Sequence, residues 1–260
     1  MHWYAGTSGY SYKEWLGSFY PEALKTDAML GYYAVRLPTV EINNTFYRMP
    51  RTQVLQSWCD AVPNDFRFVV KASRRITHQL RLNDAQEPTE YLARKLEALG
   101  DKLGAVLFQL PPYLRKDMDR LRSFLDVLPQ ALPSAFEFRH ASWLDDEVFD
   151  LLAKRNRAIC ASEDDESEAP MRLATTDWLY LRLRKTAYDD AMLKAWHRTA
   201  QATPAKHAFV FFKHEDEATG PATAARFLEL TRVETKAALP PRRAAPRQTQ
   251  KSPTTKGKRA

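Results

Sequence analysis

The chain has very little cysteine. Only Cys59 and Cys160 occur among its 260 residues, they lie far apart, and they match no metal-ligand spacing. This usage excludes a disulfide scaffold and a zinc finger, and it predicts reduced thiols in a cytoplasmic protein. Cys160 falls within a predicted strand, where a buried apolar thiol is expected rather than a nucleophile.

Long apolar runs are also missing. No apolar stretch approaches the roughly 20 residues that a membrane-spanning helix needs, and no charged-then-apolar leader opens the chain. We therefore expect no membrane partner and no export. Several short catalytic motifs are absent as well, namely the Gly-x-Ser-x-Gly elbow, the P-loop and the Gly-x-Gly-x-x-Gly loop. Nothing in the sequence indicates a cofactor.

The net charge of +7 is concentrated at one end of the chain. Residues 235–260 hold eight Lys or Arg and no Asp or Glu; subtracting the eight from 39 basic residues leaves 31, against 32 acidic ones. The prolines and scarce large apolar residues of this segment predict a disordered basic tail after a folded domain at 1–234. Such a tail is either a solvated extension or a source of loose affinity for nucleic acid.

Short apolar or alternating runs alternate with helix-like segments along residues 1–234. Leu92, Leu96 and Leu99 repeat at helical spacing, as do Val148, Leu151 and Leu152, and a last helix is expected near Pro221. Eight strands joined by helices predict an α/β fold of the TIM-barrel-like (β/α)8 type, which needs about 250 residues. The expected strands are 3–7, 39–43, 66–71, 105–110, 135–139, 158–162, 179–184 and 208–213.

Polar residues recur where these strands end. Strand side chains alternate between two faces, and inward-facing residues at the carboxyl ends of barrel strands form the functional face. The residues expected to share a face are Glu41 with Asn43, Val69 with Lys71, Leu107 with Gln109, Glu137 with Arg139, Arg182 with Arg184, and Phe211 with Lys213.

Five segments resemble one known family. They are "GTSGYSYKEWLGSFYP" (6–21), "VEINNTFYRMP" (40–50), "FVVKASRRITH" (68–78), "KLGAVLFQLPP" (102–112) and "EFRHASW" (137–143). In this order they resemble the YecE-like family, also called domain of unknown function 72, over roughly residues 2–230. The resemblance implies a TIM barrel, similar to xylose-isomerase-like and endonuclease-IV-like barrels, and implies no particular reaction.

The chain differs from the family pattern at two strand ends. The family usually has His-Gly after its seventh strand, where this sequence has Arg184 and Lys185. It usually has Asn-Asn or Asn-Asp after its eighth strand, where this sequence has Lys213, His214 and Glu215. Both differences fall on the expected ligand face.

The expected mouth of the barrel carries more bases than acids. The acids are Glu41 and Glu137, and the bases are Lys71, Arg139, Arg182, Arg184 and Lys213. This excess predicts an anionic small molecule bearing phosphate or carboxylate, with Ser8, Asn43 and Gln109 adding neutral hydrogen-bonding groups. Glu41 and Glu137 are candidate acid and base, provided that their environments separate their pKa values, and His140 is a candidate proton shuttle.

Structural alternatives stand beside these roles. Glu137 and Arg139 can belong to a buried network, Asn43 and Asn44 can form a turn, and Gln109 can satisfy loop backbone groups. The aromatic residues Trp15, Tyr20, Phe46 and Tyr47 can stack on a ligand or pack beneath their loops. His78 is expected to hydrogen-bond within a loop, His197 to lie on a helix surface, and the acidic run at 162–168 to be a solvated loop.

A metal site is the sharpest chemical alternative. Glu41, Glu137, His140, His214 and Asp216 are the possible ligands, but no His-x-His or Glu-x-x-His spacing occurs, and the interleaved Lys and Arg would repel a cation. We therefore expect no metal. The leading interpretation is an enzyme acting on an anionic small molecule; the alternatives are a nucleic-acid-processing protein and a non-catalytic ligand sensor.

Overall fold

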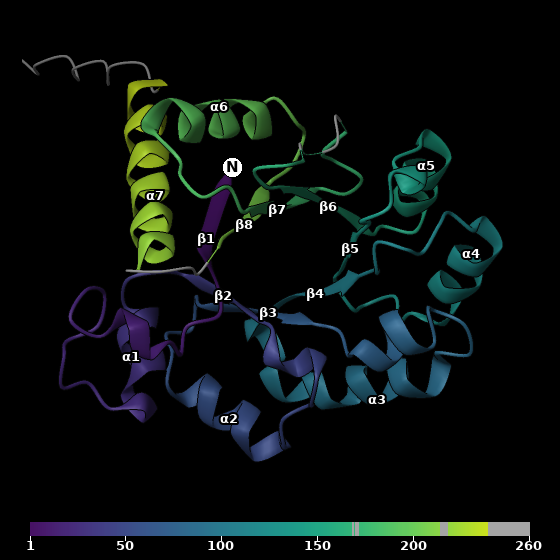
Figure 1. Ribbon diagram of the computed structural model, residues 1–260, viewed down its shortest axis with the longest axis horizontal. Coiled ribbons are helices and arrows are strands. Elements are labelled where there is room, and N and C mark those ends of the chain that lie inside the picture. Colours follow the sequence, from purple (N-terminus) through teal and green to yellow (C-terminus); the bar gives the residue numbers. More distant parts are fainter. Residues whose placement is uncertain (168, 170–171, 214–217, 239–260) are drawn as a thin grey trace, which may run out of the picture.

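Eight parallel strands close into one barrel (Figure 1). The computed structural model describes residues 1–167, 169, 172–213 and 218–238. Each strand pairs with the next, and β8 pairs with β1. The predicted TIM-barrel-like fold is confirmed, although no helix lies between β6 and β7 among the described residues. The strands are β1 (His2–Ser8), β2 (Thr39–Ile42), β3 (Arg67–Lys71), β4 (Leu103–Gln109), β5 (Ser134–Glu137), β6 (Ala158–Glu163), β7 (Trp178–Leu183) and β8 (His207–Phe212).

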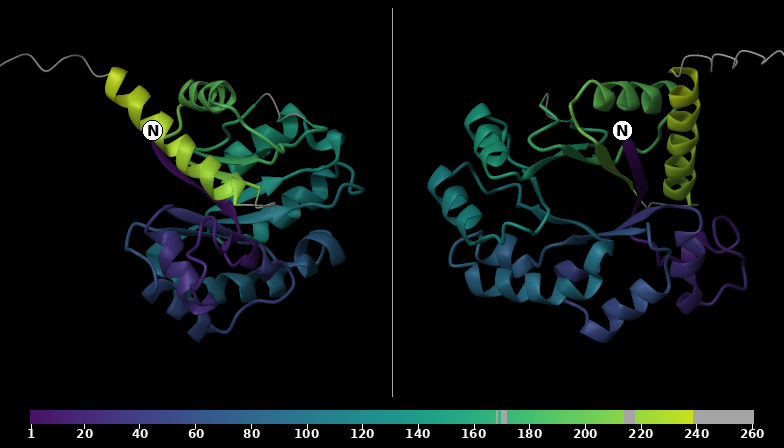
Figure 2. Two further views of the ribbon diagram at one scale, coloured as in Figure 1. Left: turned by 60° about the vertical axis from the view of Figure 1, so that its left-hand side comes forward. Right: turned by 180° about the vertical axis from the view of Figure 1, so that it is seen from behind.

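Helices surround the barrel, and the two further views in Figure 2 show the same ring obliquely and from behind. They are α1 (Met29–Ala34), α2 (Thr52–Asp60), α3 (Gln86–Leu96), α4 (Met118–Val127), α5 (Asp146–Lys154), α6 (Asp190–Gln201) and α7 (Thr219–Ala238). Short 3₁₀ or π turns are η1 (Lys13–Trp15), η2 (Thr26–Ala28), η3 (Asn44–Phe46), η4 (Arg75–Gln79), η5 (Glu97–Lys102) and η6 (Ala141–Trp143). None of the described helices is long and apolar enough to cross a membrane.

Aspartates fix where three of the helices begin. Asp117, Asp145 and Asp189 each accept a hydrogen bond from a backbone N–H in the first turn of α4, α5 and α6. The first turns of a helix leave N–H groups without backbone partners, so a side-chain oxygen at this position stabilises the start by about 1 kcal/mol. These caps set the length of the loops that follow β4, β5 and β7.

Alternation along the strands separates two apolar regions. Val69, Leu107 and Phe211 belong to an apolar cluster in the barrel interior, as their predicted pairing with Lys71, Gln109 and Lys213 requires. The intervening residues, such as Val70 and Phe108, pack in the shell between strands and helices. The interior cluster fills the barrel, so polar groups one step further along each strand gather at its carboxyl end.

Several predicted boundaries move. Asn43, Arg139, Arg184 and Lys213 lie just beyond the ends of β2, β5, β7 and β8 rather than within them. The last helix begins at Thr219, two residues before Pro221, and continues to Ala238. Residues 235–238 are therefore helical rather than part of a tail, and the rest of the predicted tail lies outside the described residues.

Candidate functional site

Glu41 is fully buried at the carboxyl end of β2. Its Oε1 accepts hydrogen bonds from Ser8 Oγ at 2.9 Å, Asn43 Nδ2 at 3.1 Å and Arg182 Nη2 at 2.9 Å. Its Oε2 accepts one from the Tyr180 hydroxyl at 2.6 Å. The Glu41 carboxylate therefore accepts four hydrogen bonds, which offset the free-energy cost of burying its charge.

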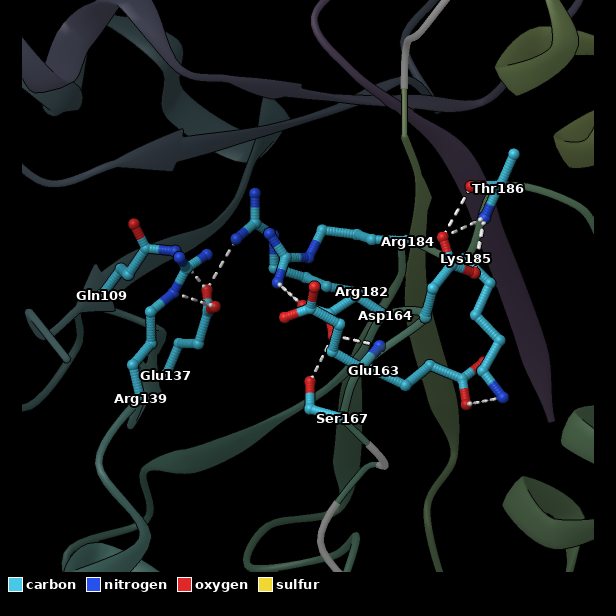
Figure 3. Close-up of polar contacts among 12 residues, drawn as sticks. Gln109, Glu137, Arg139, Glu163, Asp164, Ser167, Arg182, Arg184, Lys185 and Thr186 are labelled. Atoms are coloured by element: carbon cyan, nitrogen blue, oxygen red, sulfur yellow. Dashed lines mark hydrogen bonds and ion pairs between the residues drawn. The ribbon is translucent and has the colours of Figure 1, made fainter.

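Arg182 joins Glu41 to a second buried carboxylate. Its Nη1 donates to Glu137 Oε2 at 2.7 Å, while its Nη2 holds Glu41. Gln109 Nε2 at 2.8 Å and Arg139 Nε at 3.0 Å complete the contacts of Glu137 (Figure 3). Both terminal nitrogens of Arg182 are thus committed within the protein, and its side chain is only 6% exposed. Arg182 therefore orders the two carboxylates by one hydrogen bond from each of its terminal nitrogens.

The network keeps both glutamates ionised. Burial alone would raise the pKa of Glu137, but Arg182, Arg139 and Arg184 together with the Gln109 hydrogen bond lower it to about 2. Burial opposes ionisation of Glu41 as well, yet Arg182, Tyr180 and Ser8 hold its pKa below the ordinary value. The two pKa values move in the same direction, so the site does not separate a protonated acid from an ionised base in the way that acid–base catalysis by the pair requires.

Lys71 is different from the other charged residues of the site. It ends β3, its side chain is half-buried, and its Nζ lies 4.5 Å from the ring centroid of Phe46. Within the described residues its ammonium makes no hydrogen bond and no ion pair. Burial and the repulsion from Arg182 lower the pKa of Lys71 to about 8, although Glu41 and Glu137 act in the opposite direction. A sizeable fraction of Lys71 is therefore neutral near physiological pH.

Arg139 and Arg184 retain unused donors at the same end of the barrel. Arg139 Nε donates a hydrogen bond to Glu137, and the Arg139 side chain is 34% exposed. Arg184 Nη2 donates a hydrogen bond to Asp164 Oδ2 at 3.1 Å, as Figure 3 shows. The remaining guanidinium N–H groups of both residues have no acceptor among the described residues. These groups have the fork geometry that suits phosphate and carboxylate.

Buried polar atoms without partners mark the same place. Among the described residues, Asn43 Oδ1, Ser162 Oγ, Arg182 Nε and Arg184 Nε are buried and make no hydrogen bond. Ser162 and Arg182 are register neighbours on β6 and β7. Buried polar groups in folded proteins nearly always have a partner, so these atoms require water or a bound solute.

Most of the predicted site residues converge, but they do not all play the predicted part. Asn43 and Asn44 do form a turn, since Asn43 precedes η3 and its backbone oxygen accepts from Phe46 N, while the Asn43 side chain donates to Glu41. The Gln109 side chain donates to Glu137. His140 caps η6, with its Nδ1 2.9 Å from Ser142 Oγ, and neither ring nitrogen contacts another predicted site residue. Lys213 lies after β8, where its charge, after the stronger effect of hydrogen bonds from Thr186, helps to lower the pKa of Asp165. His214, Glu215 and Asp216 lie outside the described residues.

Two residues of the site escaped sequence reasoning. Tyr180 faces inward on β7, but a tyrosine between leucines in "WLYLRL" looks like an ordinary core residue. Asp164 follows β6 within the acidic run at 162–168, which was expected to be a solvated loop. The alternation of side chains along β7 could have identified Tyr180, because Tyr180 is expected on the same face of the strand as Arg182 and Arg184.

Other expectations are corrected by burial. Glu163, from the same acidic run, is 5% exposed and accepts hydrogen bonds from Tyr188 and Trp196, each at 2.8 Å. His197 is 1% exposed and packs on Trp3, so it is no surface residue. Trp15 and Tyr20 are buried beneath their loop and cannot stack on a ligand.

His78 does bond within its own turn, to Thr77 Oγ1 at 2.9 Å. Its ring also packs on Phe46, whose other neighbour is Lys71. Burial and then the charge of Lys71 lower the pKa of His78. This histidine therefore belongs to the surroundings of Lys71.

The described residues contain no group of three or more His, Cys, Asp or Glu able to hold a metal ion. Within the site itself, the guanidinium of Arg182 occupies the position between Glu41 and Glu137 that a bridging cation would take. The predicted absence of a metal and of a cofactor stays a prediction.

The comparisons with known proteins decide the family. The family described as "Protein of unknown function DUF72" matches residues 4–250. The chain belongs to the DUF72 family. Its predicted resemblance to YecE-like proteins is confirmed, and the match reaches beyond residue 230 into the segment that was expected to lie outside it.

Two UPF0759 proteins are similar to part of the chain. The UPF0759 protein YecE of Escherichia coli K12 is 34% identical over 110 residues, which are 42% of this chain and 40% of YecE. The UPF0759 protein YunF of Bacillus subtilis 168 is 27% identical over 156 residues, which are 56% of this chain and 54% of YunF. The chain thus spans less than two thirds of the length of either relative.

Solved DUF72 structures share the fold. A DUF72 family protein from Thermotoga maritima superposes with a TM-score of 0.80 at 26% identity, over 89% of this chain and 100% of that one. A DUF72 family protein from Enterococcus faecalis V583 gives 0.67 at 20% identity, over 80% and 94%. A xylose isomerase-like TIM barrel/4-hydroxyphenylpyruvate dioxygenase fusion protein gives 0.53 at 14% identity, over 91% of this chain and 44% of that one, a likeness of fold alone.

Proposed function

We propose that the carboxyl end of the barrel binds an anionic small molecule whose phosphate or carboxylate contacts Lys71, Arg139 and Arg184. The observation that carries the proposal is the set of unused donors. Glu41 and Glu137 are already saturated by hydrogen bonds, while the three cations keep N–H groups without acceptors among the described residues. A bound anion would satisfy these groups and relieve the repulsion among them.

Asp164 reduces the excess of positive charge that the sequence predicts, but it does not remove it. Counting Lys71 as protonated, the described acids of the site are Glu41, Glu137 and Asp164, and its bases are Lys71, Arg139, Arg182 and Arg184. Because Lys71 has a lowered pKa, an arriving anion would also favour its protonation. Ligand binding and proton uptake are therefore coupled at this site.

If the protein is an enzyme, Lys71 is the best candidate for proton transfer. Among the described residues of the site, Lys71 has an ammonium group without a hydrogen bond or ion pair, and its pKa lies near physiological pH. A pKa near the working pH is the condition for efficient general acid–base catalysis. Glu41 and Glu137 would then hold Arg182 and tune Lys71 electrostatically rather than exchange protons. This assignment replaces the acid and base roles that the sequence suggests for the two glutamates.

Thermal-shift titration tests the proposal. The wild-type protein is titrated with sulfate, inorganic phosphate, sugar phosphates and small carboxylates, alongside Arg139→Ala and the control Lys154→Ala. Lys154 is exposed at the carboxyl end of α5, and its substitution removes one positive charge, as Arg139→Ala does. We expect at least one anion to stabilise the wild type and the control but not Arg139→Ala. An anion response equal in all three proteins would contradict the proposal.

A ligand found in this way also separates an enzyme from a sensor. The ligand is incubated with the protein and followed by NMR for product. Turnover that is lost in Lys71→Met supports catalysis, whereas tight binding without product supports a sensor. The nucleic-acid role suggested by the basic tail stays a prediction, because residues 239–260 lie outside the described residues.

A further inference from the structure

A second surface lies beside the barrel mouth, between the loop after β2, helix α2 and helix α3. It is a groove of about 1020 Å³, called the α2–α3 groove below. The residues that matter for its chemistry are Tyr47, Arg48, Arg51, Val54, Tyr91 and Lys95. None of them contributes to the network around Glu41 and Glu137.

The groove exposes large apolar side chains. Tyr47 is 74% exposed, Tyr91 43% and Val54 41%. A single exposed apolar side chain needs no explanation, but three that line one groove make it a candidate interaction surface. Two of the three are tyrosines, whose flat rings favour stacking partners over the aliphatic side chains that a helix-binding groove receives.

Positive charge surrounds these rings. Arg48 and Arg51 are exposed and make no ion pair or side-chain hydrogen bond with the described residues. Lys95 lies over the ring of Tyr91 at 5.7 Å, and Arg75 of the same groove is paired with Glu87 at 3.5 Å. A partner that combines negative charge with flat rings would complement these side chains.

The loop that carries Tyr47 and Arg48 is held in place. Thr45 is buried, and its hydroxyl donates to the backbone oxygens of Ile42 at 3.0 Å and Lys71 at 2.8 Å. This anchoring fixes the start of the groove against the end of β3. A partner in the groove would bind a preformed surface and lose less entropy than on a loose loop.

We infer that the α2–α3 groove binds single-stranded nucleic acid, with bases stacked on Tyr47 and Tyr91 and phosphates held by Arg48 and Arg51. Single strands are bound in this way by stacking platforms within basic grooves, because their bases are free to leave one another. The inference concerns a surface other than the barrel mouth and does not depend on the proposed function.

Fluorescence anisotropy with a labelled 12-nucleotide single strand of mixed sequence tests it on the full chain. We expect Tyr47→Ala to weaken binding about fivefold or more, and Tyr47→Phe to bind within about twofold of the wild type, since only the ring is needed. Arg48→Ala/Arg51→Ala should reduce the slope of log K against log salt by about 1.4 in magnitude, from roughly 0.7 for each lost phosphate contact on a single strand.

The matched control is Lys154→Ala/Arg198→Ala, which removes two exposed charges from α5 and α6, on the other side of the barrel from α2 and α3 (Figure 1). Any binding due to the basic residues after position 238 is the same in this control and in the groove variants, so the comparison isolates the contribution of the groove. Equal losses in control and groove variants would overturn the inference, as would unchanged binding in the groove variants. Mononucleotides binding as tightly as the 12-nucleotide strand, or an acidic peptide binding the groove where the strand does not, would also overturn it.

All substituted groove side chains are exposed, so the variants should melt within a few degrees of the wild type. A variant that binds less tightly while melting normally has lost contacts with the strand rather than its fold.

Discussion

Arg182 and Glu41 are 141 residues apart in the chain, and their side chains form a buried ion pair of 2.9 Å. The closure of the barrel brings β7 and β2 to the same interior, and the other terminal nitrogen of Arg182 holds Glu137 from β5. One guanidinium therefore ties together three strands at the end of the barrel where the candidate site lies.

Removing that guanidinium should destabilise the whole domain. Arg182→Met leaves two buried carboxylates without their shared cation, and we expect a loss of about 3–5 kcal/mol in the free energy of unfolding measured in urea. Arg122→Met is the control, because Arg122 is 45% exposed and its ion pairs lie on the surface. A loss below about 1 kcal/mol in Arg182→Met would show that the pair does not organise the barrel.

Acid should weaken the protein through Glu137. Its folded pKa of about 2 lies below the ordinary value of 4.5, so its stabilising contribution is complete above pH 4.5 and is lost as the pH falls toward 2. The shift corresponds to about 3 kcal/mol. Unfolding followed between pH 5 and pH 2 should have a shallower pH dependence in Glu137→Gln, while the exposed control Glu147→Gln should follow the wild type.

Alkali should act in the opposite direction through Lys71. Its folded pKa of about 8 lies below the ordinary 10.5, so the folded state binds fewer protons than the unfolded state between these values, and stability rises with pH there. We expect the wild type to gain about 1–3 kcal/mol relative to Lys71→Met between pH 8 and pH 10.5. Parallel curves for the two proteins would mean that Lys71 is solvated and ordinary.

Tyr180 should be needed for the charge state of Glu41. Tyr180→Phe removes the 2.6 Å hydrogen bond to Oε2, which leaves a buried acceptor short of one donor at a cost of about 1–3 kcal/mol. The pKa of Glu41 should rise, which carbon NMR of the carboxylate measures. Tyr113→Phe, at a tyrosine that is 63% exposed, should change neither quantity.

The fold follows from the sequence because alternation along a strand is a local property. The parity that pairs Val69 with Lys71 and Leu107 with Gln109 needs only the spacing of residues, and the interior cluster obeys it. The convergence of Glu41, Glu137 and Arg182 follows in turn from barrel closure. Sequence alone could therefore predict which residues meet.

What each of these residues does could not be predicted in the same way. The division of donors between Glu41 and Glu137 depends on distances of a few tenths of an ångström, and only the structure shows that Arg182 bridges the two carboxylates. The proton-transfer role of His140 stays a prediction, and only the structure shows that its ring caps a 3₁₀ turn. His197 occupies a helix position whose burial depends on the packing of Trp3, 194 residues earlier in the chain.

The most direct measurement is the pKa of Lys71 by NMR of the labelled lysine side chain, with and without sulfate, which remains a dianion throughout the titration. We predict a value of about 8 in the free protein and a clear rise when sulfate is added, abolished by Arg139→Ala. A pKa near 10.5 in the free protein, or one that saturating sulfate leaves unchanged, would contradict an anion site at the end of this barrel.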